Sequence, residues 1–370
     1  MPVEKLLLRF TAFFWLLAKL ISFKLWLADR LYPVVPPIEL LEIKWAVVHK
    51  VLFFVSLAIL FSIIVLKKVS HLLIPLAVLE IFSCLLDTTR WQPWEYQYIF
   101  MTFIFYSGRN NKRLIYKGML IILVSTYVYS GLHKINGGFL SSVWEGLILK
   151  KFFGLSVPTI KTLHLHYAGL LLAVAETALG ISLLFAKGKR RPAILLISMH
   201  VFLLVLLGPL GININAVIWP WNMAMCAMLY LLFIYKHNGF DGKPLPVTPY
   251  ITLVLFWGIL PMFSFIGYWP SYLSSSLYSG SGTQLKICME NTGTQPQLSP
   301  YVLANKPNTQ CSGSYKIMVG NWANKELSVP MQYELWYIKM FKKEWQKKYP
   351  NKGARFFAYR KAHKEVIEIR

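Results

Sequence analysis

The segment YVYSGLHKINGGFL, at residues 127–140, ends an apolar run with groups that could do chemistry. Tyr127, Gly131 and Lys134 fall at helix positions i, i+4 and i+7 and therefore share one face. Gly131 leaves room for a ligand or another backbone. A lysine held between apolar walls loses hydration, which favours the free amine, and such an amine can act as a base near neutral pH. The alternative is an ordinary helix-end lysine that snorkels to the polar layer. His133 points about 100° away and is a second catalytic candidate, as a hydrogen-bonding neighbour.

Two further ionisable residues lie inside apolar runs, where a charge is costly and a functional role is the default hypothesis. Glu176 lies in LLLAVAETALGISLLF and His200 in ISMHVFLLVLLG. At 1.5 Å per residue they lie ~16 Å and ~18 Å from the same membrane edge, on consecutive antiparallel helices. We expect them to face each other or share a cavity. They would relay protons, hold a quinone-like headgroup, or lock two helices together as a hydrogen-bonded pair.

Polar and aromatic residues also follow another apolar run, in LLDTTRWQPWEYQY. Asp87 and Arg90 are spaced i, i+3 and are expected to form an ion pair that stabilises the turn. Trp91 opens an aromatic group that is either an interfacial belt or the wall of a site for a flat ligand. His49 lies about one turn below the outer end of its run and could join the same cavity.

Asparagines occur at the remaining polar junctions. Asn136 follows the lysine segment, Asn213 lies in GPLGININ and Asn222 in WPWN. They are candidate cofactor-binding residues. Alternatively, they satisfy backbone groups freed by Pro209 and Pro220.

Membrane-spanning helices must position these residues. The chain of 370 residues is 56% apolar and only 15% charged, whereas soluble domains carry about 25% charge. We expect an all-α polytopic membrane bundle of eight or nine transmembrane helices over residues 1–270. The span at 97–108 is short, so that it is either re-entrant or its hydrophobic segment begins near Trp91, and 8–28 is partly interfacial. The candidate spans are 8–28, 44–66, 71–88, 97–108, 114–134, 165–186, 192–209, 216–235 and 249–270.

Positive charge predicts the orientation of these spans. Alternate ends are basic, and the positive-inside rule places them in the cytoplasm: Lys67–Lys68, Arg109–Lys117, Lys187–Arg191 and Lys236–Lys243. The N-terminus is then cytoplasmic and the tail extracytoplasmic, which means periplasmic if the protein belongs to a bacterial inner membrane. The three polar junctions fall together on the outer face and suggest one outward-opening site. The net charge of +23 fits contact with membrane lipids, and no nucleic-acid motif accompanies it.

The tail differs in character from the rest of the chain. Residues 271–370 predict a small extracytoplasmic α+β or strand-rich domain, in which QLKICME alternates like a strand. Cys288 and Cys311 both lie in it, and an oxidising compartment would allow a disulfide between them.

Residues 140–164 predict an amphipathic helix in the outer headgroup layer, ended by Pro158.

Taken together, three segments resemble the horizontally transferred transmembrane domain proteins, a group that includes the vitamin K-dependent gamma-carboxylases. The matching segments are DTTRWQPWEYQY, YVYSGLHKINGGFL and the run from His200 through GPLGININAVIWPWN, within about residues 45–280, with the helical core at about 45–270. In the carboxylases, a lysine in a matching aGxKKLd segment is the base that deprotonates the reduced quinone, and by position it matches Lys134. The resemblance therefore implies a quinone or hydroquinone cofactor among the outer-leaflet helices.

The chain also departs from the carboxylase pattern. The pair His133–Lys134 replaces two lysines, and the tail is much shorter than the lumenal region that binds carboxylation substrates. We therefore expect a quinone-handling relative with another substrate, either carboxylase-like or oxidoreductase-like.

Three functions stay open on the sequence. The first is binding of a quinone-like or isoprenoid lipid, with Lys134 as base. The second is a non-catalytic membrane subunit that assembles with, or passes electrons to, a protein partner docked on the C-terminal domain. The third is a transporter with a midplane site at Glu176 and His200. No metal site is predicted, because HLH at His164–His166 is too short a signal.

Overall fold

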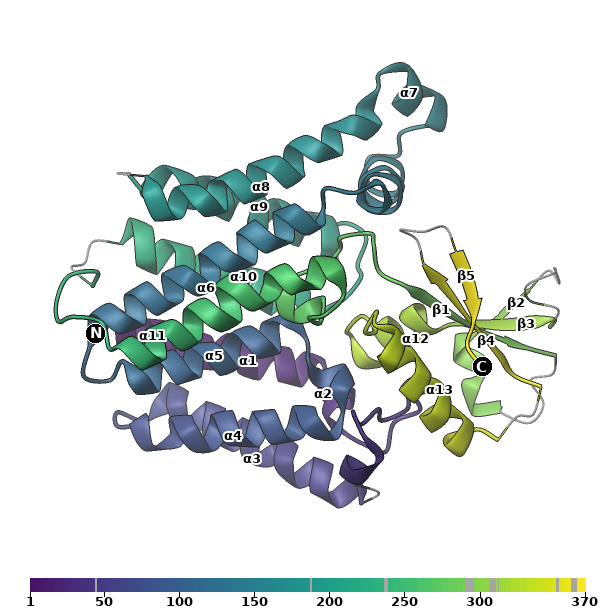
Figure 1. The fold of residues 1–370 in the computed structure, drawn as a ribbon, viewed down its shortest axis with the longest axis horizontal. Coiled ribbons are helices and arrows are strands. Elements are labelled where there is room, and N and C mark those ends of the chain that lie inside the picture. Colours follow the sequence, from purple (N-terminus) through teal and green to yellow (C-terminus); the bar gives the residue numbers. More distant parts are fainter. Residues whose placement is uncertain are drawn as a thin grey trace. The chain divides into compact units, whose positions relative to one another are not determined.

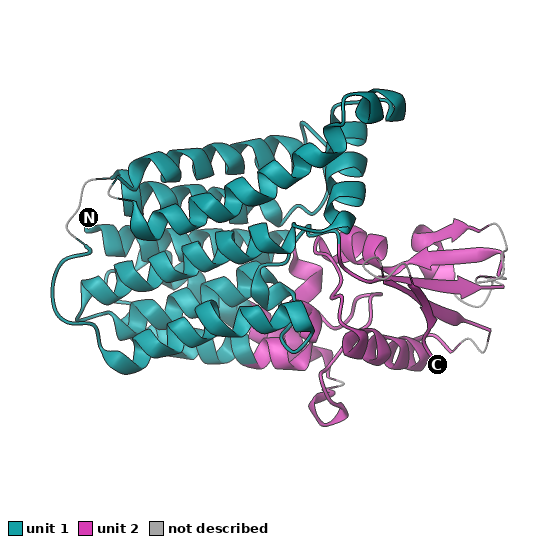
Figure 2. Cartoon of the chain, turned by 45° about the horizontal axis from the view of Figure 1, so that its top comes forward, with its two compact units in different colours: residues 1–21, 54–81, 91–280 teal, residues 22–53, 82–90, 281–370 magenta. Residues whose placement is uncertain are grey.

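The computed structural model describes most of the chain and divides it into two compact units (Figure 1, Figure 2). Unit 1 contains residues 1–21, 54–81 and 91–280, and unit 2 contains residues 22–53, 82–90 and 281–370. Unit 2 thus combines the tail with segments that the sequence analysis grouped with the membrane bundle. The described residues are 1–43, 45–186, 188–235, 239–290, 296–305, 311, 313–350, 353–360 and 365–370. Of the basic ends expected in the cytoplasm, Lys187 and Lys236 lie outside these ranges.

The protein is mostly helical, and five of its described helices are long and apolar enough to cross a membrane. They are α3 (Ala46–Val65), α6 (Lys112–His133), η4 and α8 together (Leu165–Ala168 and Gly169–Phe185), α9 (Arg190–Leu207), and the continuous series α11 (Val247–Leu253), η6 (Val254–Ile259) and η7 (Leu260–Ile266). The shorter apolar helices are α4 (Ser70–Leu86) and α10 (Ile218–Leu229), which continues as η5 (Tyr230–Ile234).

Three other helices precede or separate these segments, and two differ from the predicted spans. They are α1 (Val3–Ile21), α2 (Phe23–Trp26) and α5 (Pro93–Ser107). The run predicted at 8–28 is not one helix, because α1 ends at Ile21 and α2 starts anew at Phe23. The helix predicted at 97–108 begins at Pro93, in agreement with the alternative start near Trp91. Proline has no N–H to lose in the first turn and favours helix starts.

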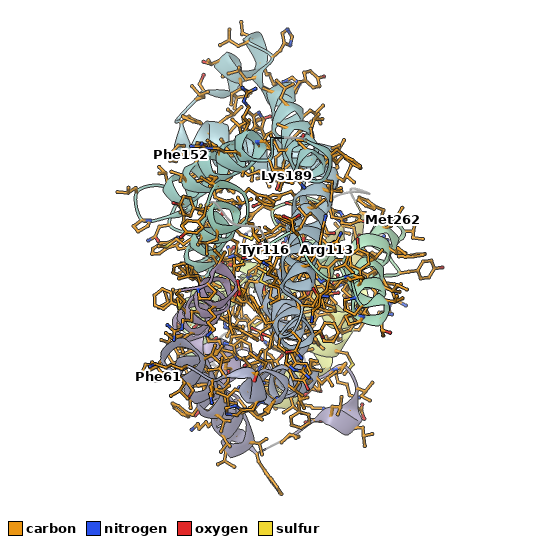
Figure 3. The ribbon with its side chains drawn as sticks, turned by 90° about the vertical axis from the view of Figure 1, so that its left-hand side faces the viewer. Phe61, Arg113, Tyr116, Phe152, Lys189 and Met262 are labelled. Carbon is orange, nitrogen blue, oxygen red and sulfur yellow. A yellow bond between two sulfur atoms is a disulfide. The ribbon has the colours of Figure 1, made fainter. Side chains whose placement is uncertain are left out.

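Burial identifies α6 as the central helix of unit 1. Its apolar window is 78% buried, against 17–33% for the other four long helices. It contacts α1, α5, α8 and α11. The outward faces of the surrounding helices are apolar: Phe61 and Met262, which project from the periphery in Figure 3, are each 60% exposed. Exposed apolar side chains on helices of this length fit a lipid-facing surface.

The segment after α6 differs from the prediction of a single helix ended by Pro158. It forms η3 (Phe139–Phe152), with hydrogen bonds of the i→i+5 type, and then the short α7 (Val157–Thr162). Pro158 stands in the first turn of α7, so that it begins a helix instead of ending one. The one-turn helix η8 (Tyr272–Ser274) lies near the end of unit 1.

Unit 2 contains a five-stranded antiparallel sheet in the order β2-β3-β1-β4-β5 (Figure 1). Its strands are β1 (Gln284–Met289), β2 (Val302–Ala304), β3 (Tyr315–Met318), β4 (Arg355–Arg360) and β5 (Glu365–Glu368). Its helices include η1 (Glu39–Leu41), η2 (Thr88–Arg90), η9 (Pro296–Tyr301), α12 (Val319–Leu327) and α13 (Leu335–Lys348). The predicted mixed, strand-containing tail is confirmed.

The alternation predicted for β1 is also confirmed, since Leu285, Ile287 and Met289 are buried on one face. On the other face Cys288 forms a disulfide with Cys311, with a Cα–Cα distance of 5.7 Å. Phe357 and Val366 pack against this disulfide. A disulfide persists in oxidising compartments, and it is therefore a hint of an extracytoplasmic location for the C-terminal domain.

Candidate functional site

Lys134 caps the C-terminal end of α6 and forms an ion pair with Glu176 of α8. The Lys134 Nζ lies 2.6 Å from Glu176 Oε2 and 2.6 Å from the Ser130 hydroxyl oxygen, one helical turn earlier. A lysine ammonium has three N–H donors, and contacts within the described chain occupy two of them. Glu176 Oε1 accepts no hydrogen bond from the described residues. The pair therefore retains one donor and one acceptor for a ligand.

Two glycines allow α6 and α8 to approach closely enough for this pair. A Cβ at Gly131 would lie 2.7 Å from the Ala173 carbonyl oxygen and 2.8 Å from the Thr177 backbone nitrogen, both of α8. A Cβ at Gly180 of α8 would lie 2.8 Å from the Tyr127 Cβ. Small residues at such positions let helix backbones pack in direct contact. Of the two alternatives for Gly131, the structure shows the second: the space holds another backbone.

A second hydrogen-bonded group links α6, α9 and α10. Asn222 Nδ2 donates to the Ile218 carbonyl at 2.7 Å, which orients the amide so that Oδ1 is the acceptor facing His200 Nδ1 at 2.6 Å. Nδ1 therefore carries the proton, and Nε2 accepts from the Tyr127 hydroxyl at 2.7 Å. Both ring nitrogens of His200 are thus occupied, and the imidazole is neutral in this arrangement. The chain of bonds pins three helices around one cavity.

Both groups line a cavity of about 110 Å³, formed by α6, η3, α8, α9, α10 and residues 275–278. Tyr127, Ser130, Lys134 and Glu176 contribute polar atoms to its wall, as do His200 and Asn222. Most of the remaining wall is leucine, isoleucine, phenylalanine, valine and methionine. The prediction that Glu176 and His200 share a cavity is confirmed, but they do not pair with each other: Glu176 binds Lys134 and His200 binds Tyr127 and Asn222.

The other predicted residues near α6 do not line this cavity. The His133 ring stacks on Phe265 with ring centroids 4.3 Å apart, and its Nε2 lies 3.0 Å from the Ser264 hydroxyl. Asn136 donates to the carbonyls of His133 and Ser279 at 2.6 and 2.9 Å, and therefore ties the end of α6 to the end of unit 1. These contacts position the backbone after α6, and of these three neighbouring residues Lys134 lines the cavity.

Two residues predicted from the outer junctions also lie away from the cavity. Asn213 is exposed and has a left-handed backbone conformation, with φ of 53°. Trp91 packs edge-on against Tyr96, with ring centroids 6.4 Å apart. Of the same aromatic group, Tyr96 also stacks on Trp257 and Tyr98 packs on Trp15, and none of these rings lines the cavity.

Asp87 and Arg90 belong to unit 2, where they form a buried polar core and do not line the cavity. The predicted ion pair is present but loose, at 3.8 Å, whereas Arg30 binds the same carboxylate oxygen at 2.5 Å. The other oxygen accepts from the backbone N–H groups of Val35 and Thr89. Burial alone would raise the pKa of Asp87, but the positive charges of Arg30 and Arg90 outweigh it and hold the pKa below its ordinary value.

Arg90 satisfies the backbone around it and thereby explains why this segment is not part of the cavity. It donates to the carbonyls of Leu25, Trp26 and Ser83 at 2.9–3.2 Å. Its guanidinium also lies 2.9 Å from His49 Nδ1. His49, Asp87 and Arg90 thus have their partners within unit 2 and do not line the cavity, whereas the other two polar junctions contribute Lys134 and Asn222 to it.

Several buried polar residues went unnoticed in the sequence. Ser130 could have been found, since it lies four residues before Lys134. Trp221 lines the cavity and donates to Gln97 at 2.6 Å. Lys19 and Glu80 form a buried ion pair in unit 1 at 2.7 Å. The rule that selected Glu176, an ionisable residue in an apolar run, applied equally to Glu80.

The cavity suits a small amphiphile with one aromatic ring. Its volume of about 110 Å³ is somewhat below that of an apolar cavity of ~150 Å³ that binds benzene, and the Lys134–Glu176 ion pair lies on its wall. Within the described ranges, no group of three histidine, cysteine or carboxylate side chains could hold a metal ion.

Compared with known proteins, the chain matches no family model and has no significant match among curated proteins or solved structures.

Proposed function

We propose that this is a multi-span membrane protein that binds a quinone-type headgroup in the cavity of unit 1 and removes a proton from its hydroxyl. The observation that carries the proposal is the Lys134–Glu176 ion pair, at 2.6 Å, on the wall of a largely apolar cavity. The resemblance to horizontally transferred transmembrane domain proteins supports the same ligand class. When bound, a hydroquinone supplies an acidic ring hydroxyl and two electrons.

The apolar wall and the ion pair have separate tasks in this proposal. Side chains such as Leu172, Leu203 and Met225 would surround the ring and exclude water. The remaining Lys134 N–H and Glu176 Oε1 would contact the hydroxyl oxygen and its proton. An isoprenoid tail would remain in the lipid phase.

The ion pair changes which residue serves as the base. An ammonium that donates to a carboxylate has no lone pair to accept a proton, whereas Glu176 Oε1 does. Glu176 would therefore take the hydroxyl proton, and the Lys134 ammonium would stabilise the oxyanion that forms. Lys134 could also accept the proton itself after passing its own to Glu176. In both routes one proton moves from the ligand to the pair.

The proposed topology has nine membrane segments, counting α1, α5 and the shorter apolar helices, with the N-terminus in the cytoplasm. The disulfide between Cys288 and Cys311 supports an extracytoplasmic C-terminal domain, residues 281–370. In a bacterial inner membrane, that compartment is the periplasm.

The test is to purify the protein with native lipids and identify bound quinones by mass spectrometry. Lys134→Met and Glu176→Gln should each reduce the quinone retained by about tenfold or more, because each removes a charge-assisted contact. Lys150→Met is the matched control, since it breaks another lysine–glutamate pair, with Glu145, at the surface of η3. Equal retention in all four proteins would exclude the ion pair from ligand binding.

One observation favours the non-catalytic alternative, in which the protein is a subunit and the pair only locks α6 to α8. Lys134 is capped by a carboxylate, as a structural role requires. Replacing both partners of a buried pair with methionine is often neutral for stability. A Lys134→Met/Glu176→Met double variant that retains both its stability and its bound quinone would support a purely structural role for the pair, as in the subunit. Retained stability with lost quinone would support the proposed site. No specific observation favours transport.

A further inference from the structure

A second concave site lies at the end of unit 1 where the N-terminus is found, the end that faces the viewer in Figure 3. The start of α1, the turn between α3 and α4, and the turn between α5 and α6 form a groove of about 430 Å³. It shares no residue with the cavity that holds Lys134. One carboxylate, Glu4, faces it, together with five basic side chains: Lys5, Arg9, Lys67, Lys68 and Arg109.

The five basic side chains lie close together, but no carboxylate of the described chain pairs with them. None of the five forms an ion pair with a carboxylate in the described part of the chain. With Glu4 included, the groove carries a net charge of +4, from five positive groups and one negative group. Like charges that converge from three separate segments repel one another unless an anion is present.

Two of the basic side chains are held in place by the protein. Arg9 donates to the Leu66 carbonyl at 3.3 Å, which directs its guanidinium to the α3–α4 turn. Arg109 donates to the Tyr106 carbonyl at 2.9 Å and lies over the Tyr106 ring at 4.3 Å from the centroid. Fixed guanidinium groups suit phosphate recognition, because their planar fork binds two oxygens at once.

The floor of the groove is apolar and continues into a lipid-facing surface. Leu8, Ile63, Leu73 and Phe105 line the groove beneath the charges. Along α3, Phe61 is 60% exposed, and Val65 and Leu66 next to the groove are about half exposed. A ligand that fits must therefore carry an anionic head and apolar chains.

We propose that this groove binds the phosphate headgroup of an anionic phospholipid, with its acyl chains lying along α3. Arg9 and Arg109 would hold the phosphate, and Lys67 and Lys68 would neutralise the remaining charge. Basic pockets between transmembrane helices on the cytoplasmic side are a recurring place for such headgroups. The site is independent of the proposed quinone function.

The test is native mass spectrometry of the full-length protein in detergent, titrated with phosphatidylglycerol or phosphatidylcholine. Lys67→Gln/Lys68→Gln should raise the dissociation constant for phosphatidylglycerol about tenfold, since each lysine contributes to attraction by an anionic headgroup. Lys150→Gln/Lys151→Gln, which removes another pair of adjacent lysines, should leave it unchanged. Phosphatidylcholine binding should be equal in all three proteins.

A second variant and a competing ligand test whether weaker lipid binding by the lysine variant comes from the groove itself. They separate this cause from misfolding or failed membrane insertion of that variant. Arg109→Gln keeps both lysines and should still weaken phosphatidylglycerol binding severalfold. The difference between this variant and the wild type should disappear at high salt, which screens the charges. Glycerol phosphate should compete only weakly, because it lacks acyl chains. Equal losses in the groove and control variants would overturn the site. Displacement of the lipid by glycerol phosphate at equal concentration would show a free phosphate site instead.

Discussion

Two of the lysine–glutamate ion pairs described in unit 1 have nearly the same length and very different surroundings. Lys19 and Glu80 join α1 to α4 at 2.7 Å, and their side chains are 1% and 0% exposed. Lys134 and Glu176 join α6 to α8 at 2.6 Å, and their side chains are 13% and 7% exposed, on the wall of a cavity. The same two groups are thus sealed in one place and accessible in the other.

The two glutamates also differ in how far their hydrogen-bonding capacity is filled. Both oxygens of Glu80 have partners, since Ser56 donates to Oε1 and Lys19 to Oε2. Glu176 lines the cavity and has a partner at Oε2, whereas Oε1 accepts no hydrogen bond from the described residues. The sealed pair has partners at both carboxylate oxygens and joins two helices, whereas a pair with an open acceptor can also exchange a proton with a ligand. A candidate binding site therefore differs from a purely structural ion pair in two respects: its side chains are exposed to a cavity, and one of its hydrogen-bonding atoms has no partner.

The largest expected effect is on stability at the sealed pair. Lys19→Met leaves an unpaired charge in a water-free interior and should cost ~3–5 kcal/mol of unfolding free energy. Lys134→Met should cost less, ~1–3 kcal/mol, because Glu176 can hydrate or protonate from the cavity. Unfolding in mixed micelles titrated with sodium dodecyl sulfate measures both values. Equal losses would mean that the two pairs do not differ in the way their exposure suggests.

A glycine substitution should disturb only the accessible pair. Gly131→Ala places a methyl group against the α8 backbone, 2.7 Å from the Ala173 carbonyl oxygen, and should push α6 away from α8. We expect a loss of ~1–3 kcal/mol together with weaker ligand binding, because the Lys134–Glu176 distance increases. Gly137→Ala is the control, since its Cβ would meet no atom within 4 Å. A stable Gly131→Ala protein with normal ligand retention would contradict the importance of this close approach.

The smallest expected effect concerns Asp87, a sealed carboxylate outside the membrane spans. Because Arg30 and Arg90 lower its pKa in the folded protein, Asp87 contributes stability above its ordinary pKa, and this contribution is lost as the pH falls through the folded value. Between pH 7 and pH 4 the loss should be less than about 1 kcal/mol, and it should grow below pH 4. Urea unfolding over this pH range measures it.

Two variants show whether that pH dependence comes from Asp87. Asp87→Asn should flatten the acid limb of the stability profile, in addition to lowering stability at neutral pH. Glu368→Gln removes a surface carboxylate that is paired with Arg355 and should change the profile little. Identical acid limbs in the wild type and in Asp87→Asn would assign the dependence to other groups.

Local patterns predicted some features of the fold well. The period-two alternation of Leu285, Ile287 and Met289 was sufficient for β1, because strand side chains alternate between faces. The i, i+4, i+7 spacing placed Tyr127, Gly131 and Lys134 on one face, and Tyr127 and Lys134 do line one cavity. Such predictions succeed when the information lies within a few residues.

Partner choices were predicted poorly because they depend on residues far away in the chain. Asp87 and Arg90 had the right spacing, yet Arg30, 57 residues away, binds Asp87 more closely. The estimated distances from the membrane edge matched Glu176 with His200. Those distances ignore side-chain direction, and helix side chains lean toward the N-terminus of their helix. Lys134 therefore reaches back past Ser130 to Glu176, and the predicted apolar surroundings of its amine include a carboxylate.

The sequence by itself determined that long apolar helices alternate with polar junctions, that the tail contains strands, and that Cys288 and Cys311 share it. Composition and short periodicities are sufficient for these features, because each depends only on how neighbouring residues meet water or lipid. Only the tertiary structure decided that Lys134 pairs with Glu176 beside a cavity while Lys19 and Glu80 are sealed. The first outcome depends on how closely the α6 and α8 backbones pack, and Gly131 and Gly180, which meet across that interface, allow the close approach.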